Sequence, residues 1–366
     1  MRIKYGEWII ELSDDTHPKE LMIEVTTRCN YNCIYCFRRK LSEPYRDMEI
    51  NLYKKIINDA AKAGVNKIVF SGWGEPLVHP RIIEMLTIAK DNGFKVLLNT
   101  NGSLLESFAE EIVELGIDEL VVSIDAPEET YSALRLGGTL DNVTNALSRI
   151  KKLKREKNTL YPNVKLQFTI TRRNYRRLPD MIEYAKIVGS SHIIVSNIIP
   201  LTADIDESMA CYNDKECIDY VSKVTHLAAR ESLNIGITIV MPNMSYIVER
   251  KCPFINRQAL YIRADGLVSP CIYYAHSWTN CFMSVEREIK EVVFGDLKSE
   301  NLLSIWRKKD YALFRLKTFF FMMPSCLDCL LKDYCNYTMT NIFDCWGNNP
   351  TCAHCPYSHD ITRCPL

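Results

Sequence analysis

The chain has 366 residues, and its 45 Lys and Arg balance 45 Asp and Glu, so the formal net charge is zero. This balance argues against a nucleic-acid partner, because phosphate binding requires a basic surface. No apolar run approaches the roughly 18–20 residues needed to span a bilayer. The first residues also lack the apolar centre of a signal peptide, so we expect no membrane partner and a cytoplasmic location.

Over the first 200 residues, short apolar strands alternate with amphipathic helices. Glycines follow four of the helices, where left-handed backbone geometry is wanted. The expected strands are Leu21–Thr26, Lys67–Gly72, Lys95–Asn101, Glu119–Asp125, Asn163–Thr171 and Ser191–Ile199. The expected helices are Tyr53–Ala63, Arg81–Asp91, Phe108–Leu115, Leu140–Lys154 and Leu178–Val188.

This alternation predicts an α/β fold whose parallel sheet is connected by crossover helices. Six strand–helix units suit a partial (β/α)6 barrel of the TIM type over residues 1–202, with a doubly wound sheet as the alternative. In either fold, the chemistry should collect at the carboxyl ends of the strands.

The pattern changes after Pro200. We expect a connecting helical segment over residues 203–250, with one helix at Asp214–Glu231. Residues 251–366 should form a cysteine-rich domain, because a loop-rich tail of this kind buries little core and metal clusters can substitute for one. Its expected elements are a hairpin of Leu260–Arg263 with Leu267–Tyr273 and a helix at Asn301–Leu316.

Cysteine is the unusual feature of the composition, with 15 residues, ten of which lie from Cys252 to Cys364 inclusive. In a secreted chain this density would indicate disulfides. In a chain of this length without a signal sequence, it favours metal or cluster ligation.

Cys29, Cys33 and Cys36 follow the first expected strand with the spacing Cys-x3-Cys-x2-Cys. Three thiolates on one tight loop can hold three corners of a [4Fe–4S] cubane and leave the fourth iron open, whereas a closed structural site wants four ligands. The alternative is a zinc loop that lacks one partner, or a set of free thiols.

This spacing resembles that of the radical S-adenosylmethionine (SAM) superfamily, in which Tyr35 matches the aromatic residue before the third cysteine. The resemblance implies that SAM binds the open iron and is cleaved reductively to a 5′-deoxyadenosyl radical, which removes a substrate hydrogen. The cofactors then carry the chemistry, so no further catalytic side chain is expected.

Residues 71–76, Ser-Gly-Trp-Gly-Glu-Pro, resemble the Gly-Gly-Glu-Pro segment that holds the SAM amino group in this superfamily. Trp73 stands where the first glycine of that segment would be. Glycines let the main chain approach a ligand, and a carboxylate pairs with an ammonium group. The resemblance implies SAM contacts for Gly72, Gly74, Glu75, Asn99, Ser123, Asp125, Arg135 and Asn197, and equally for Asn101. Loop capping or a surface ion pair is the alternative for the polar residues after Glu75.

A second cysteine array begins with Cys252-x13-Gly266-x4-Cys271 and continues with Cys326-x2-Cys329-x5-Cys335. It resembles the SPASM domain, which carries one or two auxiliary [4Fe–4S] clusters. The array departs from that pattern at Met339, where a further cysteine is usual. The resemblance implies that Cys252 and Cys271 hold one cluster and Cys326, Cys329 and Cys335 the other. The late cysteines that close them would come from Cys345, Cys352, Cys355 and Cys364.

A zinc ribbon is the alternative interpretation of this array, because paired cysteines also suit tetrahedral zinc. Cys211, Cys217 and Cys281 fit no ligand spacing, and we expect them to be buried thiols.

Within this group, residues 198–203 and 344–348 most resemble the family of cofactor-modifying proteins associated with tungsten-containing aldehyde ferredoxin oxidoreductase. The resemblance implies a maturase of the tungsten-pterin cofactor or of its host enzyme, served by an electron donor such as a ferredoxin. A peptide- or sulfatase-type maturase is one alternative. A non-catalytic iron–sulfur electron carrier is another, although a carrier needs no SAM loop.

Overall fold

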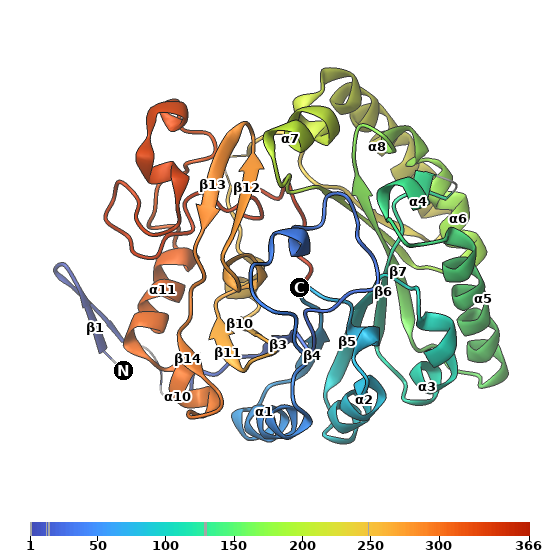
Figure 1. Ribbon diagram of the computed structural model, residues 1–366, viewed down its shortest axis with the longest axis horizontal. Coiled ribbons are helices and arrows are strands. Elements are labelled where there is room, and N and C mark those ends of the chain that lie inside the picture. The colour runs from blue at the N-terminus through green and yellow to red at the C-terminus, as the bar shows by residue number, and fades with distance from the viewer. Residues whose placement is uncertain (1, 12, 14, 128–129, 248) are drawn as a thin grey trace.

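The computed structural model describes residues 2–11, 13, 15–127, 130–247 and 249–366. At its centre lies a sheet of ten strands in the order β14-β11-β10-β3-β4-β5-β6-β7-β8-β9 (Figure 1). The strands from β3 to β9 are parallel and follow one another in chain order. These strands are β3 (Glu20–Ile23), β4 (Lys67–Phe70), β5 (Lys95–Thr100), β6 (Glu119–Ser123), β7 (Asn163–Ile170), β8 (His192–Asn197) and β9 (Thr238–Val240).

This sequential order confirms the partial barrel and excludes the doubly wound sheet, whose strand order reverses at a switch point. All six predicted strands are present, and each ends earlier than predicted because its last residues turn into the loops at the barrel mouth. The carboxyl ends of the strands therefore point into one shared opening.

The helices cover the outer face of the curved sheet (Figure 1). In α1, the buried residues Tyr53, Ile56, Ile57 and Ala60 face the sheet, and the helix ends at Gly64 with φ of 78°. The helices of this half are α1 (Ile50–Ala63), α2 (Ile82–Asp91), α3 (Ala109–Glu114), α4 (Thr130–Leu134), α5 (Leu140–Glu156), α6 (Asp180–Val188), α7 (Ala203–Met209) and α8 (Lys215–Ile235).

The cysteine-rich half is joined to the barrel through the same sheet. Strand β10 pairs in parallel with β3, from Ala259 opposite Glu20 to Ile262 opposite Ile23. The sheet is thus continuous across the boundaries predicted near residues 202 and 250, and the predicted connecting segment contributes β9 to it. The remaining elements are α9 (Pro253–Asn256), β10 (Ala259–Ile262), β11 (Leu267–Ser269), β12 (Trp278–Phe282), β13 (Val285–Ile289), β14 (Gly295–Asp296), α10 (Leu302–Trp306) and α11 (Lys309–Phe319).

Two predicted elements of this half differ in the structure. The helix expected over 301–316 is two helices, because Lys308 has an extended backbone and donates from Nζ to the Phe294 carbonyl at 2.9 Å. The second hairpin strand ends at Ser269, since Ile272–Tyr274 forms a 3₁₀ turn directly after Cys271.

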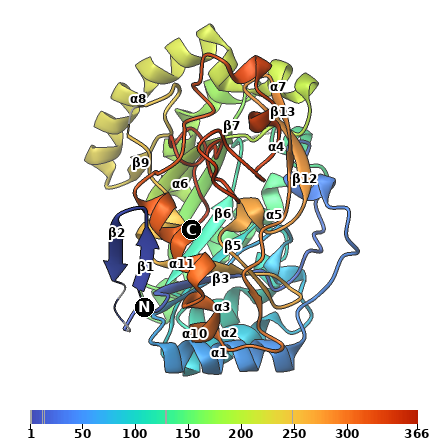
Figure 2. The same ribbon diagram turned by 90° about the vertical axis from the view of Figure 1, so that its left-hand side faces the viewer.

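Other parts of the chain lie outside the central sheet. A separate hairpin of β1 (Arg2–Tyr5) and β2 (Trp8–Glu11) is seen at one side (Figure 2). Among the described residues, no helix is both long and apolar enough to cross a membrane.

Two of the three cysteines expected as buried thiols are instead joined. Cys211 and Cys217 form a disulfide, because the turn at Cys211–Asn213 leads directly into α8 and brings their Cα atoms within 5.5 Å. Cys281 is a buried free thiol, as predicted.

Candidate active site and auxiliary thiol groups

A cavity opens at the mouth of the barrel, over the carboxyl ends of the strands. The three cysteines of the first motif line it together with most of the residues that the sequence assigned to SAM. The predicted residues that line the cavity are Cys29, Cys33, Cys36, Gly72, Gly74, Glu75, Asn99, Asn101, Ser123, Arg135 and Asn197. Of the predicted SAM contacts, Asp125 does not line it.

The cysteine loop follows β3 and is compact. The amide of Tyr31 donates to Cys29 Sγ at 3.4 Å, and the amide of Cys36 donates to the Cys33 carbonyl at 3.2 Å. Burial raises the pKa of Cys33 to about 12, the Arg135 charge opposes this, and the thiolates of Cys36 and Cys29 add to it. Three thiolates in this position need a cationic partner to stay ionised, as a metal centre provides.

Glu75 is buried and already holds the loop 71–76 against β5. Its carboxylate accepts hydrogen bonds from Leu77 N at 3.1 Å, Thr100 Oγ1 at 2.7 Å and Asn101 N at 2.6 Å. Burial raises its pKa, and these hydrogen bonds oppose the rise. A carboxylate has about four acceptor positions, so one remains for a cationic group in the cavity.

Gly72 and Gly74 are required by packing within the protein. A Cβ at Gly72 would lie 2.7 Å from Glu24 Cγ, and one at Gly74 would lie 2.3 Å from the Thr26 carbonyl oxygen. From the sequence, we expected these glycines to let the main chain come close to a bound ligand. The structure shows that the loop could not pack on the end of β3 with any side chain at either position.

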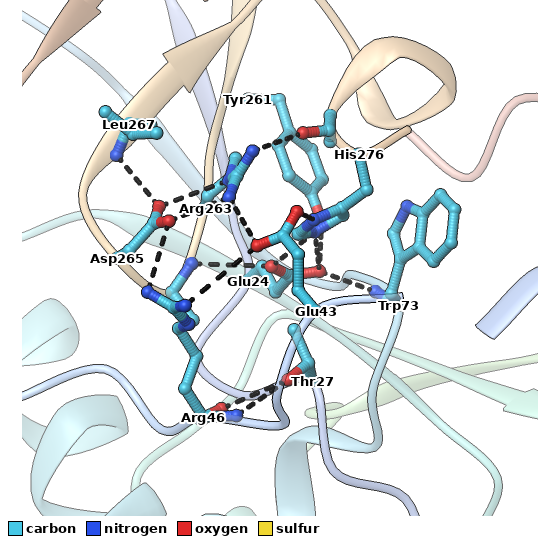
Figure 3. A network of polar contacts seen from close by, with 12 residues as sticks. Glu24, Thr27, Glu43, Arg46, Trp73, Tyr261, Arg263, Asp265, Leu267 and His276 are labelled. Atoms are coloured by element: carbon cyan, nitrogen blue, oxygen red, sulfur yellow. Dashed lines mark hydrogen bonds and ion pairs between the residues drawn. The ribbon is translucent and has the colours of Figure 1, made fainter. Parts of the chain in front are cut away.

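A network of polar side chains contacts the loop 71–76 at Trp73 (Figure 3). Glu24, just after β3, accepts from the backbone N–H of Trp73 at 3.0 Å and from Tyr261 Oη at 2.7 Å, and it pairs with His276 Nε2 at 3.0 Å. His276 Nδ1 lies 3.2 Å from Glu43, which also pairs with Arg263 at 2.8 Å. Burial lowers the pKa of His276, but the hydrogen bond and charge of Glu24 outweigh this, so the pKa is raised.

Asp125 lies behind the cavity wall and orients other side chains. It is fully buried, pairs with Arg135 Nε at 2.8 Å, accepts from the Thr169 amide at 2.9 Å, and accepts from the hydroxyl of Tyr35. Arg135 also donates from Nη2 to Asp125 Oδ1 at 3.2 Å, so four donors take up the acceptor positions of this carboxylate. This arrangement favours a supporting role over the predicted direct contact with SAM, which stays a prediction. Asp125 fixes Arg135, which does line the cavity.

Asn99 and Asn197 face a segment that the sequence did not connect with the barrel. Asn99 Nδ2 donates to the Pro365 carbonyl at 3.1 Å, and Asn197 Nδ2 donates to the Ile361 carbonyl at 2.9 Å. The segment 357–366 thus crosses the barrel mouth, and the C-terminus lies near the middle of this opening (Figure 1). Thr362 and Arg363 of this segment line the cavity and carry no local motif that could have indicated it.

The nine predicted auxiliary ligands fall into two groups whose members interact electrostatically. Burial is the main cause that raises the pKa of Cys355 and of Cys364, and the charges of Cys252 and Cys271 raise both values further. In the second group, burial raises the pKa of Cys326 to about 12, with Cys345, Cys329 and Cys335 contributing. The inner group is Cys252, Cys271, Cys352, Cys355 and Cys364. The outer group is Cys326, Cys329, Cys335 and Cys345.

The residues around the outer group fit an anionic cluster better than one metal ion. Arg287 on β13 is buried, and its Nε and Nη2 have no hydrogen-bond partner. Burial lowers its pKa, while the charges of Tyr273 and Cys326 oppose this. Arg287 Nη1 donates to the Phe282 and Val285 carbonyls, so Nε and Nη2 are left for another acceptor. A buried cation that interacts with Cys326 and has free donors is explained by an anion held there. In the part of the chain that the structure describes, no three His, Cys, Asp or Glu side chains are arranged to hold a single metal ion.

Comparison with known proteins agrees with this geometry. Residues 23–185 match the family model of the radical SAM superfamily, and residues 252–330 match SPASM, an iron–sulfur cluster-binding domain. The chain is 33% identical over 351 residues to the tungsten-containing aldehyde ferredoxin oxidoreductase cofactor-modifying protein of Pyrococcus furiosus. The matched region covers 95% of this chain and 97% of that protein. It is 32% identical over 190 residues to the probable GTP 3′,8-cyclase of Methanocaldococcus jannaschii, covering 51% of this chain and 61% of that protein.

Two solved structures share the fold. Native anSMEcpe with bound AdoMet has a TM-score of 0.62 at 18% identity, covering 85% of this chain and 87% of that chain. Streptococcus suis SuiB bound to precursor peptide SuiA has a TM-score of 0.61 at 16% identity, covering 88% of this chain and 71% of that chain.

The chain belongs to the radical SAM superfamily, carries a SPASM domain, and is a member of the family of the tungsten-containing aldehyde ferredoxin oxidoreductase cofactor-modifying protein. It is therefore a radical SAM enzyme, and its domains imply [4Fe–4S] clusters and SAM as cofactors. This membership sets aside the non-catalytic electron carrier.

Proposed function

We propose that this enzyme matures the tungsten-pterin cofactor, or the protein that carries it, of an aldehyde ferredoxin oxidoreductase. The observation that carries the proposal is the 33% identity to the Pyrococcus furiosus cofactor-modifying protein, which extends over 97% of that protein. The likeness covers 95% of this chain, so it extends over both the barrel and the cysteine-rich half and is not confined to the SAM side. A cytoplasmic location and an electron donor of the ferredoxin type belong to the same proposal.

Cys29, Cys33 and Cys36 would hold the SAM-binding [4Fe–4S] cluster at the cavity floor. When bound, this cluster supplies the electron that breaks the S–C5′ bond of SAM and so gives the 5′-deoxyadenosyl radical. Glu75 offers its remaining acceptor position to the SAM ammonium, and Arg135 offers a cation to the carboxylate. Asp125 and Tyr35 orient Arg135, while Ser123, Asn101 and the segment 357–366 exclude water from the cavity.

The inner and outer thiol groups would each hold one auxiliary cluster. Cys345 would complete the outer group in place of the cysteine that Met339 replaces. The inner group contains five thiols, one more than a cubane requires, so one of Cys352, Cys355 and Cys364 stays free.

The test is anaerobic turnover with reconstituted enzyme, SAM and dithionite. We expect 5′-deoxyadenosine to rise above the substrate-free rate when tungsten-pterin cofactor or the cofactor-containing oxidoreductase is added, with a changed mass of the pterin or of the host protein. The C29A/C33A/C36A triple variant is the control and should give no 5′-deoxyadenosine. Stimulation by peptides alone would reassign the enzyme to the peptide maturases.

A further inference from the structure

Three polar groups on α11 are buried without a hydrogen-bond partner among the residues that the structure describes. They are the hydroxyl of Tyr311, Nη1 of Arg315 and the hydroxyl of Thr318. Tyr311 is fully buried and Thr318 is 1% exposed, so bulk water does not reach these two hydroxyls. Buried polar groups in folded proteins are nearly always paired, so three unpaired ones on one short helix require an explanation.

The spacing of the three residues brings their side chains together. Positions 311, 315 and 318 are four and three apart, so they lie on one face of the helix. The Arg315 guanidinium lies 4.4 Å from the centroid of the Tyr311 ring and 3.6 Å from that of the Trp306 ring. The Tyr311 ring also stacks on Phe294, with centroids 4.2 Å apart. The aromatic rings thus fix the guanidinium and the phenol relative to each other.

This face of α11 lies beside the inner thiol group. The helix packs against α9, which begins directly after Cys252. Burial is the main cause that raises the pKa of Tyr311, and the charges of Cys271 and Cys252 add to the rise. Burial also raises the pKa of Cys352, and the nearby Thr318 side chain opposes that rise. The unpaired groups therefore adjoin three of the five inner cysteines.

The charge of Arg315 is also uncompensated. No ion pair joins its guanidinium to an Asp or Glu within the described part of the chain, and burial lowers its pKa while the Tyr311 charge opposes this. An enclosed cation is retained where an anion compensates it. The sulfur atoms of an iron–sulfur cluster carry negative charge and accept hydrogen bonds. A cluster held by the inner thiols would thus satisfy the guanidinium and both hydroxyls together, so these residues fit the group that the SPASM domain implies.

We propose that Tyr311, Arg315 and Thr318 form a donor shell for the inner cluster, in which their N–H and O–H groups donate to its sulfur atoms and the cation favours its reduced form. Reduction adds negative charge, which donors and a cation stabilise, so the shell raises the reduction potential of this cluster. None of the three lines the cavity at the barrel mouth, so they are positioning residues and not catalytic ones. The inference rests on the proposed function only in that the inner thiols hold an iron–sulfur cluster.

The experiment is an anaerobic redox titration of the reconstituted full chain, followed by electron paramagnetic resonance. Cys252→Ala identifies the inner signal, because this substitution removes a thiol of the inner group alone. Arg315→Gln then removes the charge and Tyr311→Phe removes the hydroxyl, while each keeps much of the shape of the original side chain. Iron content is measured for every variant.

Two matched controls lie in the barrel half. Arg149→Gln removes a half-exposed cation of α5, and Tyr53→Phe removes a buried hydroxyl that donates to the Met85 carbonyl at 2.8 Å. Tyr53→Phe should lower the stability of the fold, because it breaks a real hydrogen bond. Neither control should move the midpoint of the inner cluster, so a shift cannot be assigned to lost stability or to a changed net charge.

We expect Arg315→Gln to lower the ratio of reduced to oxidised inner cluster at a fixed potential by about 10-fold, which is about 59 mV for a one-electron couple. Tyr311→Phe should shift the midpoint in the same direction by less, because it removes one donor and no charge. Arg315→Lys keeps the charge and should recover part of the shift. The midpoints of the SAM-binding and outer clusters should stay as in the wild type.

An unchanged inner midpoint in both Arg315→Gln and Tyr311→Phe would overturn the proposal, since buried water would then satisfy the three groups. An equal shift of all three midpoints would also overturn it, because the effect would not belong to the inner cluster. If Arg315→Gln loses the inner iron, Tyr311→Phe decides by itself, since it retains the ring that packs on Phe294. No maturation substrate is added, so none of these results depends on the tungsten-pterin assignment.

Discussion

The indole N–H of Trp73 donates a hydrogen bond to the backbone carbonyl of Ile272, 3.1 Å away. Trp73 belongs to the proposed SAM loop, and Ile272 directly follows Cys271 of the inner thiol group. One side chain, at a position where the superfamily has glycine, therefore joins the two sites. The Trp73 ring also packs against Phe37, with ring centroids 4.6 Å apart, next to Cys36.

We predict that Trp73→Phe weakens both SAM binding and retention of the inner cluster. The variant keeps an aromatic ring but leaves the Ile272 carbonyl with only the long 3.5 Å hydrogen bond from the Ala275 amide, and a lost hydrogen bond of this kind costs about 1 kcal/mol. SAM affinity and the rate of iron loss to a chelator are the measurements. Trp306→Phe is the control, because the buried Nε1 of Trp306 has no hydrogen-bond partner. Normal iron retention in Trp73→Phe would contradict the prediction.

The His276–Glu24 pair should make stability depend on pH. The pKa of His276 is raised in the folded protein, so its stabilising contribution is complete below the unfolded value of about 6.5 and is lost as pH rises through the folded value. Glu24 and Glu43 face its ring and favour the cation, while the Arg263 charge opposes it.

The measurement is the free energy of unfolding in urea for wild type and His276→Gln, across a pH series under anaerobic conditions. The gap between the two proteins should be largest at pH values below about 6.5 and narrow at higher pH. A gap that stays constant across the series would show that the ring acts only by packing.

Arg287 should raise the reduction potential of the outer cluster. Reduction adds negative charge, which a buried unpaired guanidinium stabilises, so Arg287→Met should shift the midpoint to a more negative value. An anaerobic redox titration followed by electron paramagnetic resonance measures it. Lys332→Met is the control, because this lysine is only partly buried, and solvent and salt screen its charge. A midpoint unchanged in Arg287→Met would remove the assigned electrostatic role.

The grouping of the late cysteines predicts which cluster each substitution removes. Cys345→Ala should lower the iron content by one cluster and leave the inner signal intact, since Cys345 interacts with Cys326 and its neighbours. Cys364→Ala should affect the inner group alone, and by little if Cys364 is its surplus thiol. Cys281→Ala, which removes a buried thiol of neither group, should keep all iron. Iron analysis with Mössbauer spectra would show whether the two losses are separate.

The barrel and the cavity floor could be predicted from sequence because their signals are local. Alternating strands and helices indicate a parallel sheet, although the strand order was settled only by the structure, and Cys29, Cys33 and Cys36 carry their spacing within eight residues. What sequence reasoning missed depends on contacts between distant segments. Asn99 and Pro365 meet across 266 positions, and His276 and Glu24 across 252. No periodicity or motif links such pairs, so the crossing segment and the buried network could be seen only in the fold.

Asp125 shows a second limit of sequence reasoning. A polar residue at a strand end is equally suited to a ligand and to the protein's own donors. Here α4 and the cysteine loop place Arg135 and Tyr35 so that both donate hydrogen bonds to Asp125. The strand-end pattern indicated that Asp125 lies near the site, and the contacts in the fold favour a supporting role for it over the predicted contact with SAM.

The pairing of β10 with β3 has a consequence for any attempt to divide this protein. Leu21, Met22 and Ile23 are fully buried, and β10 covers the side of β3 away from β4. A fragment that ends before residue 252 would present β3 as a bare edge strand, which is a template for pairing with other chains. The barrel half should therefore aggregate when it is expressed alone, and the cysteine-rich half serves it as a built-in protection against self-association.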